Sequence, residues 1–170
     1  MNSRKVKITV IFLIIILGVF GFMNRQYLKD KGYANENAEI IIKEGNMEKV
    51  LNYETIKTLG EVEFTATLDT SDTGPEEQTY TGVPLKNIIE EAGLLLEEGK
   101  IVVVRGIDGY TVALSSEEVL DEENVYLAYE INGKPLKSKS QGGSGPYQVI
   151  VRKDQFSQRW CKFVVEVEVR

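Results

Sequence analysis

At 170 residues and a formal net charge of −6, the chain has room for one domain plus an anchor. Residues 1–31 contribute +5, so residues 32–170 carry −11, which argues against nucleic acid and anionic lipid as partners. The chain has no histidine and a single cysteine, Cys161. An internal disulfide, a Ser-His or Cys-His nucleophile pair and a histidine-based zinc site are therefore excluded.

The N-terminus combines a basic segment with an apolar run. Residues 1–7 are basic, and residues 8–23, ITVIFLIIILGVFGFM, contain no charge. As a helix this run extends about 24 Å. That is slightly less than the roughly 30 Å of a bilayer core, so the flanking Lys7 and Arg25 would have to snorkel. We predict one transmembrane helix over residues 8–23, with a secretory signal cleaved after Gly21 as the alternative.

Both interpretations place the rest of the chain outside the cytoplasm. The short positive segment 1–7 is expected to stay in the cytoplasm, followed by the membrane span. Residues 24–37 are expected to form a stalk and residues 38–170 an extracytoplasmic domain. The predicted location is therefore the cell membrane, with a single pass, or the exterior if the signal is cleaved.

The start of the domain predicts a strand, a short helix and a second strand. The first strand occupies residues 38–42. Asn52 is a typical N-cap for a helix over residues 53–59, which Gly60 ends. Apolar and polar residues then alternate over residues 62–68, as in a strand with one buried face.

The middle of the domain predicts a loop and a second helix. The loop, residues 69–78, is indicated by its composition. The helix begins at Pro84, a residue that the first helical turn tolerates. Its apolar face consists of Leu85, Ile88, Ile89 and Ala92. We expect this face to pack against a sheet built from residues 101–114 and 160–169.

The second half predicts mostly strands. Ser115 and Glu118 have the spacing of a capping box for a short helix. Asn132-Gly133 is a strong hairpin signal, and residues 137–145 are typical of a flexible Gly/Ser loop. The predicted strands are 101–105, 110–114, 125–131, 147–152 and 160–169. The whole indicates an α+β domain with mixed or antiparallel sheets and short helices.

Four segments of this domain form an ordered set of motifs. They are GVPLKNIIEEAG at 82–93, DGYTVAL at 108–114, LAYEINGKPL at 127–136 and a closing GP…RW…EV at 145–169. In this order they resemble the molybdopterin-binding domain of the sulfite-oxidase family. The resemblance implies a sulfite-oxidase-like fold and, in the family, a site for a molybdopterin cofactor.

The resemblance also implies cofactor ligands that this chain lacks. In the family a cysteine just upstream of the GVPL helix binds molybdenum, whereas Ala66 or Leu68 stands near that position here. The family also offers a histidine before the residue matching Gly145 and an arginine soon after it, whereas this chain has Tyr147 and Gln148 there. We therefore assign no metal ligand and no catalytic residue, and we expect no bound molybdenum.

Five residues remain candidates for lining a ligand pocket, by the resemblance. They are Asp108, Tyr110, Tyr147, Arg159 and Trp160. Arg159 is a candidate anion contact, although an exposed base beside a core tryptophan explains it as well. The Asp-Gly turn alone explains Asp108 equally well. Cys161 is predicted to be a structural, inert thiol.

The leading hypothesis is a membrane-tethered extracytoplasmic binding or accessory module without molybdenum catalysis. Its partner would be a small ligand or a protein. One alternative is a molybdopterin-dependent oxidoreductase with atypical metal ligation. Another is a structural surface protein. Because the expected ligands are missing, the sequence favours a role that is not enzymatic.

Overall fold

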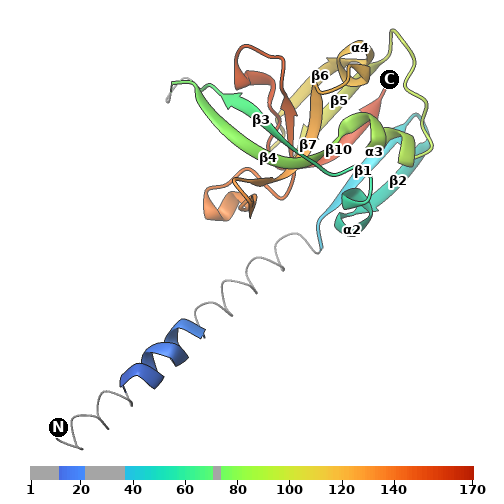
Figure 1. Cartoon of the computed structure of the whole chain (residues 1–170). Helices are drawn as coiled ribbons and strands as arrows, with labels where there is room; N and C mark the ends of the chain where they lie inside the picture. The colour runs from blue at the N-terminus through green and yellow to red at the C-terminus, as the bar shows by residue number, and fades with distance from the viewer. Residues whose placement is uncertain (1–11, 22–36, 71–73) are drawn as a thin grey trace, which may run out of the picture. The chain divides into compact units, whose positions relative to one another are not determined.

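The computed structural model describes residues 12–21, 37–70 and 74–170 (Figure 1). The chain divides into two compact units, Met1–Tyr33 and Ala34–Arg170. In the first unit, residues 12–21 form a helix with exposed side chains. Within the described ranges, no helix is long and apolar enough to cross a membrane. The predicted basic segment, both ends of the predicted span and nearly all of the stalk lie outside the described residues.

The second unit is an α+β domain built on two five-stranded sheets (Figure 1). The first sheet has the order β2-β1-β10-β5-β6; β1 and β10 are parallel, and its other pairs are antiparallel. Its strands are β1 (Glu39–Glu44), β2 (Met47–Asn52), β5 (Ile101–Gly106), β6 (Thr111–Ser115) and β10 (Val164–Val169).

The second sheet is antiparallel throughout. Its order is β3-β4-β7-β8, and β9 pairs with β7. Its strands are β3 (Val62–Leu68), β4 (Glu76–Pro84), β7 (Val125–Ile131), β8 (Lys134–Pro135) and β9 (Gln148–Val151). The short helices are α2 (Tyr53–Lys57), α3 (Leu85–Glu91), α4 (Ser116–Leu120) and the 3₁₀ turns η1 (Lys139–Gln141) and η2 (Ser157–Arg159). The predicted α+β class with mixed and antiparallel sheets is confirmed.

The predicted helix caps and the predicted hairpin turn are present in the structure. The Asn52 side chain accepts a hydrogen bond from the Thr55 amide at 2.9 Å and so caps α2. Ser115 and Glu118 form both bonds of a capping box at the start of α4. Asn132 and Gly133 both have positive φ, +50° and +68°, the conformation of a type I′ hairpin turn.

Several predicted strand boundaries were wrong, because hydrogen-bond pairing with a neighbouring strand determines where these strands begin and end. β2 was not predicted, since its sequence MEKVLN has no clean alternation; only Leu51 of its residues is buried, and pairing with β1 defines the strand. β4 begins at Glu76, inside the predicted loop, because polar Glu76–Gln78 pairs with β3. Pro84 ends β4 and is the N-cap of α3.

The last predicted strand, 160–169, begins only at Val164. Phe163 has a φ of +55°, which breaks the extended backbone before the strand. A register shift between Val164 and Glu166 then changes the facing pattern. Val164 is therefore fully buried and Val165 only partly.

The core of the domain lies between the sheets and the helices. The α3 face is fully buried, with Leu85, Ile88 and Ile89 at 0 % exposure. Its main contacts are with β4, β7 and α4, rather than with the sheet of β5 and β10 as expected. Stacked rings of Phe64 and Tyr126, 4.0 Å between centroids, extend the core along the second sheet.

Candidate functional site

Two adjoining cavities open where the second sheet meets the segment before β10. The first has a volume of about 410 Å³ and the second about 340 Å³. Both are lined by Leu68 at the end of β3, by Gln148 of β9 and by Lys162. We call the two together the cleft. It is the candidate functional site because it brings several motifs of the sequence into one concavity.

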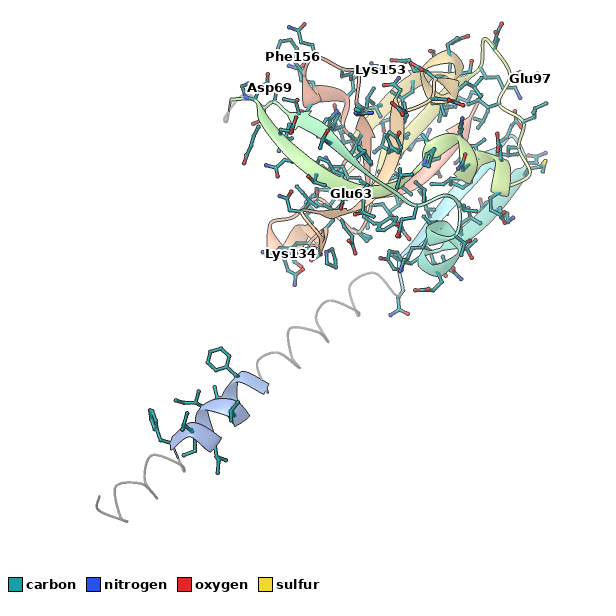
Figure 2. The ribbon with its side chains drawn as sticks, viewed as in Figure 1. Glu63, Asp69, Glu97, Lys134, Lys153 and Phe156 are labelled. Atoms are coloured by element: carbon teal, nitrogen blue, oxygen red, sulfur yellow. The ribbon has the colours of Figure 1, made fainter. Side chains whose placement is uncertain are left out.

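The first cavity combines an apolar wall with three cations. Tyr80, Ile131 and Leu136 contribute apolar surface. Lys134, on β8 beyond the Asn-Gly turn, and Lys137 line the same space together with Lys162 (Figure 2 labels Lys134). All three lysines are exposed. They come from two separate segments of the chain, which the fold brings to one cavity.

The loop that borders this cavity has a defined backbone. The Gly143 amide donates to the Ser138 carbonyl at 3.0 Å, and the Gly145 amide donates to the Lys137 carbonyl at 2.8 Å. The Phe163 amide donates to the Ser144 carbonyl at 2.9 Å and ties the loop to the segment before β10. The predicted flexible segment 137–145 is thus held in place by its own turns, which keep Lys137 at the cavity.

The second cavity contains three of the five candidates predicted from sequence. Asp108, Tyr110 and Trp160 line it. The Asp108 carboxylate accepts a bond from the Tyr110 amide at 3.1 Å, as expected for an Asx turn. The Tyr110 hydroxyl donates to the Gln158 carbonyl at 2.5 Å. The structure therefore places these three residues together.

Tyr147, predicted from the resemblance to line a pocket, does not line the cleft. Its side chain is fully buried, and its hydroxyl donates to the Ala38 carbonyl at 3.1 Å. Burial, the largest cause, raises the pKa of this phenol. The residue follows the cis Gly145-Pro146 bond and packs near the Tyr53 ring, so it belongs to the core.

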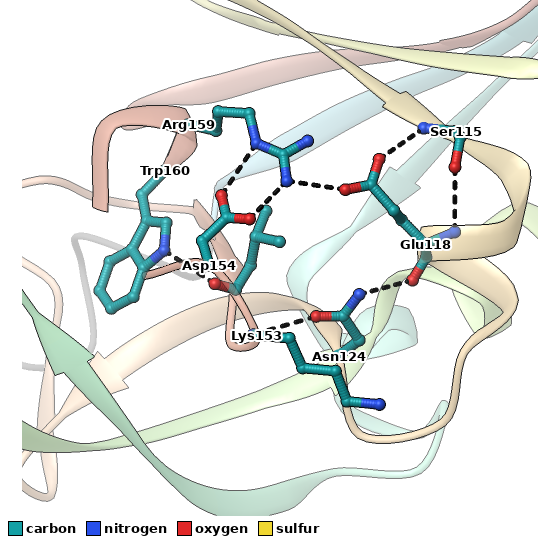
Figure 3. A network of polar contacts seen from close by, with 8 residues as sticks. Ser115, Glu118, Asn124, Lys153, Asp154, Arg159 and Trp160 are labelled. Carbon is teal, nitrogen blue, oxygen red and sulfur yellow. Dashed lines mark hydrogen bonds and ion pairs between the residues drawn. The ribbon is translucent and has the colours of Figure 1, made fainter. Parts of the chain in front are cut away.

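Arg159, the predicted anion contact, also lies outside the cleft. Its guanidinium pairs with Asp154, where Nε lies 2.9 Å from Oδ2, and with Glu118, 2.7 Å away (Figure 3). Neither cavity is lined by Arg159. Because Glu118 also belongs to the α4 capping box, the arginine links α4 to the turn after β9. Its charge is paired with these two carboxylates of the domain.

Replacing Arg159 with glutamine is expected to lower the free energy of unfolding by about 1–2 kcal/mol, between the values for exposed pairs and for charged hydrogen bonds. The hydrogen bond from Arg159 is the largest cause that lowers the pKa of Glu118. A carboxyl group whose pKa is lowered by folding stabilises the fold fully when the pH is above its pKa in the unfolded chain. This contribution is lost as the pH falls through the pKa of the folded state. Denaturation followed by circular dichroism should therefore show the deficit at pH 7 and a smaller one below about pH 4.

Lys153→Gln is the matched control for Arg159. Its partner Asp121 lies 2.6 Å away, but both side chains are about half exposed, at 57 % and 43 %. A change within about 0.5 kcal/mol is expected. An equal loss in both variants would contradict a special role for the Arg159 network.

Cys161 is not a cleft residue. It is fully buried, and its Sγ lies 3.9 Å from the Tyr110 carbonyl oxygen and 3.8 Å from that of Lys162. Burial, with a smaller contribution from Asp108, raises the pKa of the thiol to about 12. The group is thus a protonated, packed thiol at neutral pH.

Sequence reasoning missed the lysines of the first cavity. Lys134 follows the Asn-Gly turn, and Lys137 opens the Gly/Ser loop, so both signals marked turns and said nothing of a shared cavity. Lys162 lies in the predicted strand 160–169, which begins two residues later, at Val164. The gathering of the three depends on long-range pairing, and no local signal could have shown it.

The fold and the cleft define a domain of the molybdopterin-binding type. The chain belongs to the family of the oxidoreductase molybdopterin binding domain, whose model matches residues 34–170. The fold is also similar to the crystal structure of the sulfane dehydrogenase SoxCD from Paracoccus pantotrophus. The TM-score is 0.66 at 21 % identity, over 80 % of this chain and 39 % of that chain. This chain therefore spans well under half of the longer protein. No curated protein sequence matches it.

The residues of the cleft do not fit molybdenum held by a protein thiolate. Leu68 lines both cavities at the strand end where the family's cysteine is expected, and Ala66 is buried in β3. Neither side chain can bind a metal. Among the described residues, no group of three or more His, Cys, Asp or Glu is arranged to hold a metal ion. Membership of the family therefore accounts for the fold of this chain, but it does not establish that the chain has the family's metal chemistry.

Proposed function

We propose that this chain is a membrane-tethered, extracytoplasmic binding module of the molybdopterin-binding fold that works without molybdenum catalysis. The observation that carries the proposal is Leu68, an alkyl side chain that lines the cleft near the position where the resemblance leads us to expect the metal-binding cysteine. The Cys161 thiol does not take its place, because it is fully buried and lines neither cavity. The cleft itself is retained, with a polar and an apolar lining.

Membrane tethering is supported by the uncharged run 8–23 and by the helix over residues 12–21 with its exposed apolar side chains. Exposed Phe12, Leu17 and Phe20, each above 60 %, would suit a lipid environment. The basic segment 1–7 supports an orientation with the domain outside.

A second candidate function is a molybdopterin-dependent oxidoreductase in which the pterin alone holds the metal. One observation favours it, namely the three lysines of the first cavity, which can pair with a phosphate. These lysines would supply partners for the anionic tail of such a cofactor.

The test is the cofactor content of the full-length protein, purified from a host that makes molybdopterin. We expect neither molybdenum, by elemental analysis, nor a pterin, by fluorescence of an oxidised extract, at near-stoichiometric level. A cofactor-dependent enzyme made in the same host is the control for supply. Near-stoichiometric molybdenum would overturn the proposal, and pterin without the metal would favour the second candidate.

The location is tested separately, by protease added to intact protoplasts. The domain should be digested while a cytoplasmic control protein survives. Complete protection would reverse the proposed orientation. A soluble product that begins at Phe22 would show cleavage after Gly21 and remove the tether.

A further inference from the structure

Most cations in the described part of the domain have a partner. Of the fourteen Lys and Arg in the described parts of 37–170, nine form ion pairs with carboxylates. Two more, Lys57 and Lys139, lie over the rings of Tyr53 and Phe163. The three that remain have no such partner among the described residues, and all three line the first cavity. They are Lys134, Lys137 and Lys162.

Three cations line one cavity without a carboxylate partner among the described residues. The domain has many carboxylates, since residues 32–170 carry a charge of −11. None of them forms an ion pair with these lysines within the described residues, although acidic side chains neutralise cations elsewhere on the surface. Like charges at one cavity repel each other, and a bound anion would relieve the repulsion.

Gln148 gives a second, independent indication of a ligand. The residue is only 3 % exposed, and it lines both cavities. Within the described part of the chain, its side-chain amide makes no hydrogen bond. The amide is not closed off from the solvent in the cleft, and Gln148 can donate two hydrogen bonds to a ligand there and accept others. A ligand group in the cleft would satisfy it.

The second cavity indicates what the rest of the ligand is like. Trp160 and Leu68 give it apolar surface, and Asp108 gives it a carboxylate. The carboxylate repels an anionic group, so the charged end of a ligand belongs in the first cavity. The second cavity suits an uncharged, apolar or aromatic body packed near the indole.

We infer that the cleft binds a small organic anion. Its carboxylate or phosphate lies among Lys134, Lys137 and Lys162, and its apolar body extends past Gln148 toward Trp160. This inference rests on the proposed function, since it takes the cleft to be free of the family's cofactor. It names the ligand by its chemistry, namely an anionic oxygen group on an apolar body.

Trp160 allows a direct binding measurement, because it is the only tryptophan in the sequence and lines the second cavity. The probes are 4-nitrobenzoate, 4-nitrophenyl phosphate and the uncharged 4-nitrobenzyl alcohol, whose nitro rings quench indole fluorescence on contact. Titration of the full-length protein, corrected with N-acetyltryptophanamide, should show saturable quenching by the anions and at least about tenfold weaker binding of the alcohol, as expected for loss of one charged hydrogen bond.

The lysine variants locate the anionic group. Lys137→Gln and Lys162→Gln should each weaken binding of the anions by about tenfold and leave the alcohol unchanged. Lys57→Gln is the matched control, because Lys57 also lacks a carboxylate partner but stacks on Tyr53 away from the cleft. Added salt should weaken binding of the anions only, through screening. The tighter of the two anions identifies carboxylate or phosphate as the head group.

Three results would overturn the inference. These are no saturable quenching by either anion, equal affinity for the alcohol, or an equal effect of Lys57→Gln and the cleft variants. The proposed function fails by a different measurement, the cofactor content of the purified protein. A protein without pterin that also ignores the anionic probes would refute the inference and leave the proposed function standing.

Discussion

Replacing Ile89 with alanine is expected to lower the free energy of unfolding by about 2–5 kcal/mol. Ile89 is fully buried on α3, beside Leu85 and Ile88, and the helix packs against β4 and β7. Truncation removes apolar contacts on both sides and leaves a cavity that neighbouring strands cannot fill, because their backbones are fixed by ladder bonds. Urea denaturation followed by Trp160 fluorescence measures the change, since the indole is buried in the folded state.

Ile107→Ala is the control for this prediction. The Ile107 side chain is 72 % exposed in the turn between β5 and β6, so a change within about 0.5 kcal/mol is expected. If Ile89→Ala also changed stability by less than about 0.5 kcal/mol, the placement of α3 on the core would be wrong. A changed dependence of the unfolding free energy on urea concentration, with the same urea midpoint, would point to an altered denatured state instead.

Much of the fold could be predicted because its local signals agree with its tertiary pairing. The caps at Asn52 and Ser115 and the turn at Asn132-Gly133 are short-range features, and the structure contains each of them. The missed strand β2 and the early start of β4 are different. Their residues are polar or irregular, and a neighbouring strand makes them extended. Sequence periodicity cannot report a partner that lies elsewhere in the chain.

The site was less predictable than the fold. Asp108, Tyr110 and Trp160 line the cleft, whereas Tyr147 and Arg159 are used inside the domain. A family resemblance indicates which positions to consider, but the contacts of each side chain decide its role. The sequence predicts Arg159 as an anion contact, whereas in the structure its guanidinium binds Asp154 and Glu118. The lysines, in contrast, became candidates through the partners that they lack among the described residues.

Gly82 shows what a motif glycine does in this fold. It opens the GVPL segment, lies on β4, and stands at the register shift between β4 and β7. A Cβ atom placed there would lie 2.4 Å from the Leu127 carbonyl oxygen and 2.7 Å from the Ala128 Cα. Both are backbone atoms of the buried strand β7, so no side-chain rotation relieves the contact. The two strands can approach this closely because residue 82 has no side chain.

Gly82→Ala is therefore expected to destabilise the domain by at least about 3 kcal/mol, at the upper end for added volume in a packed interior. Gly74→Ala is the matched control, since a Cβ at Gly74 meets nothing within 4 Å. The added methyl group restricts mainly the unfolded chain, so this variant should not be destabilised. Urea denaturation of both variants, followed by Trp160 fluorescence, compares them with the parent chain. A loss below about 1 kcal/mol in Gly82→Ala would mean that β4 can move away from β7. In that case the close approach would not be what fixes β4 and the following helix α3 in place.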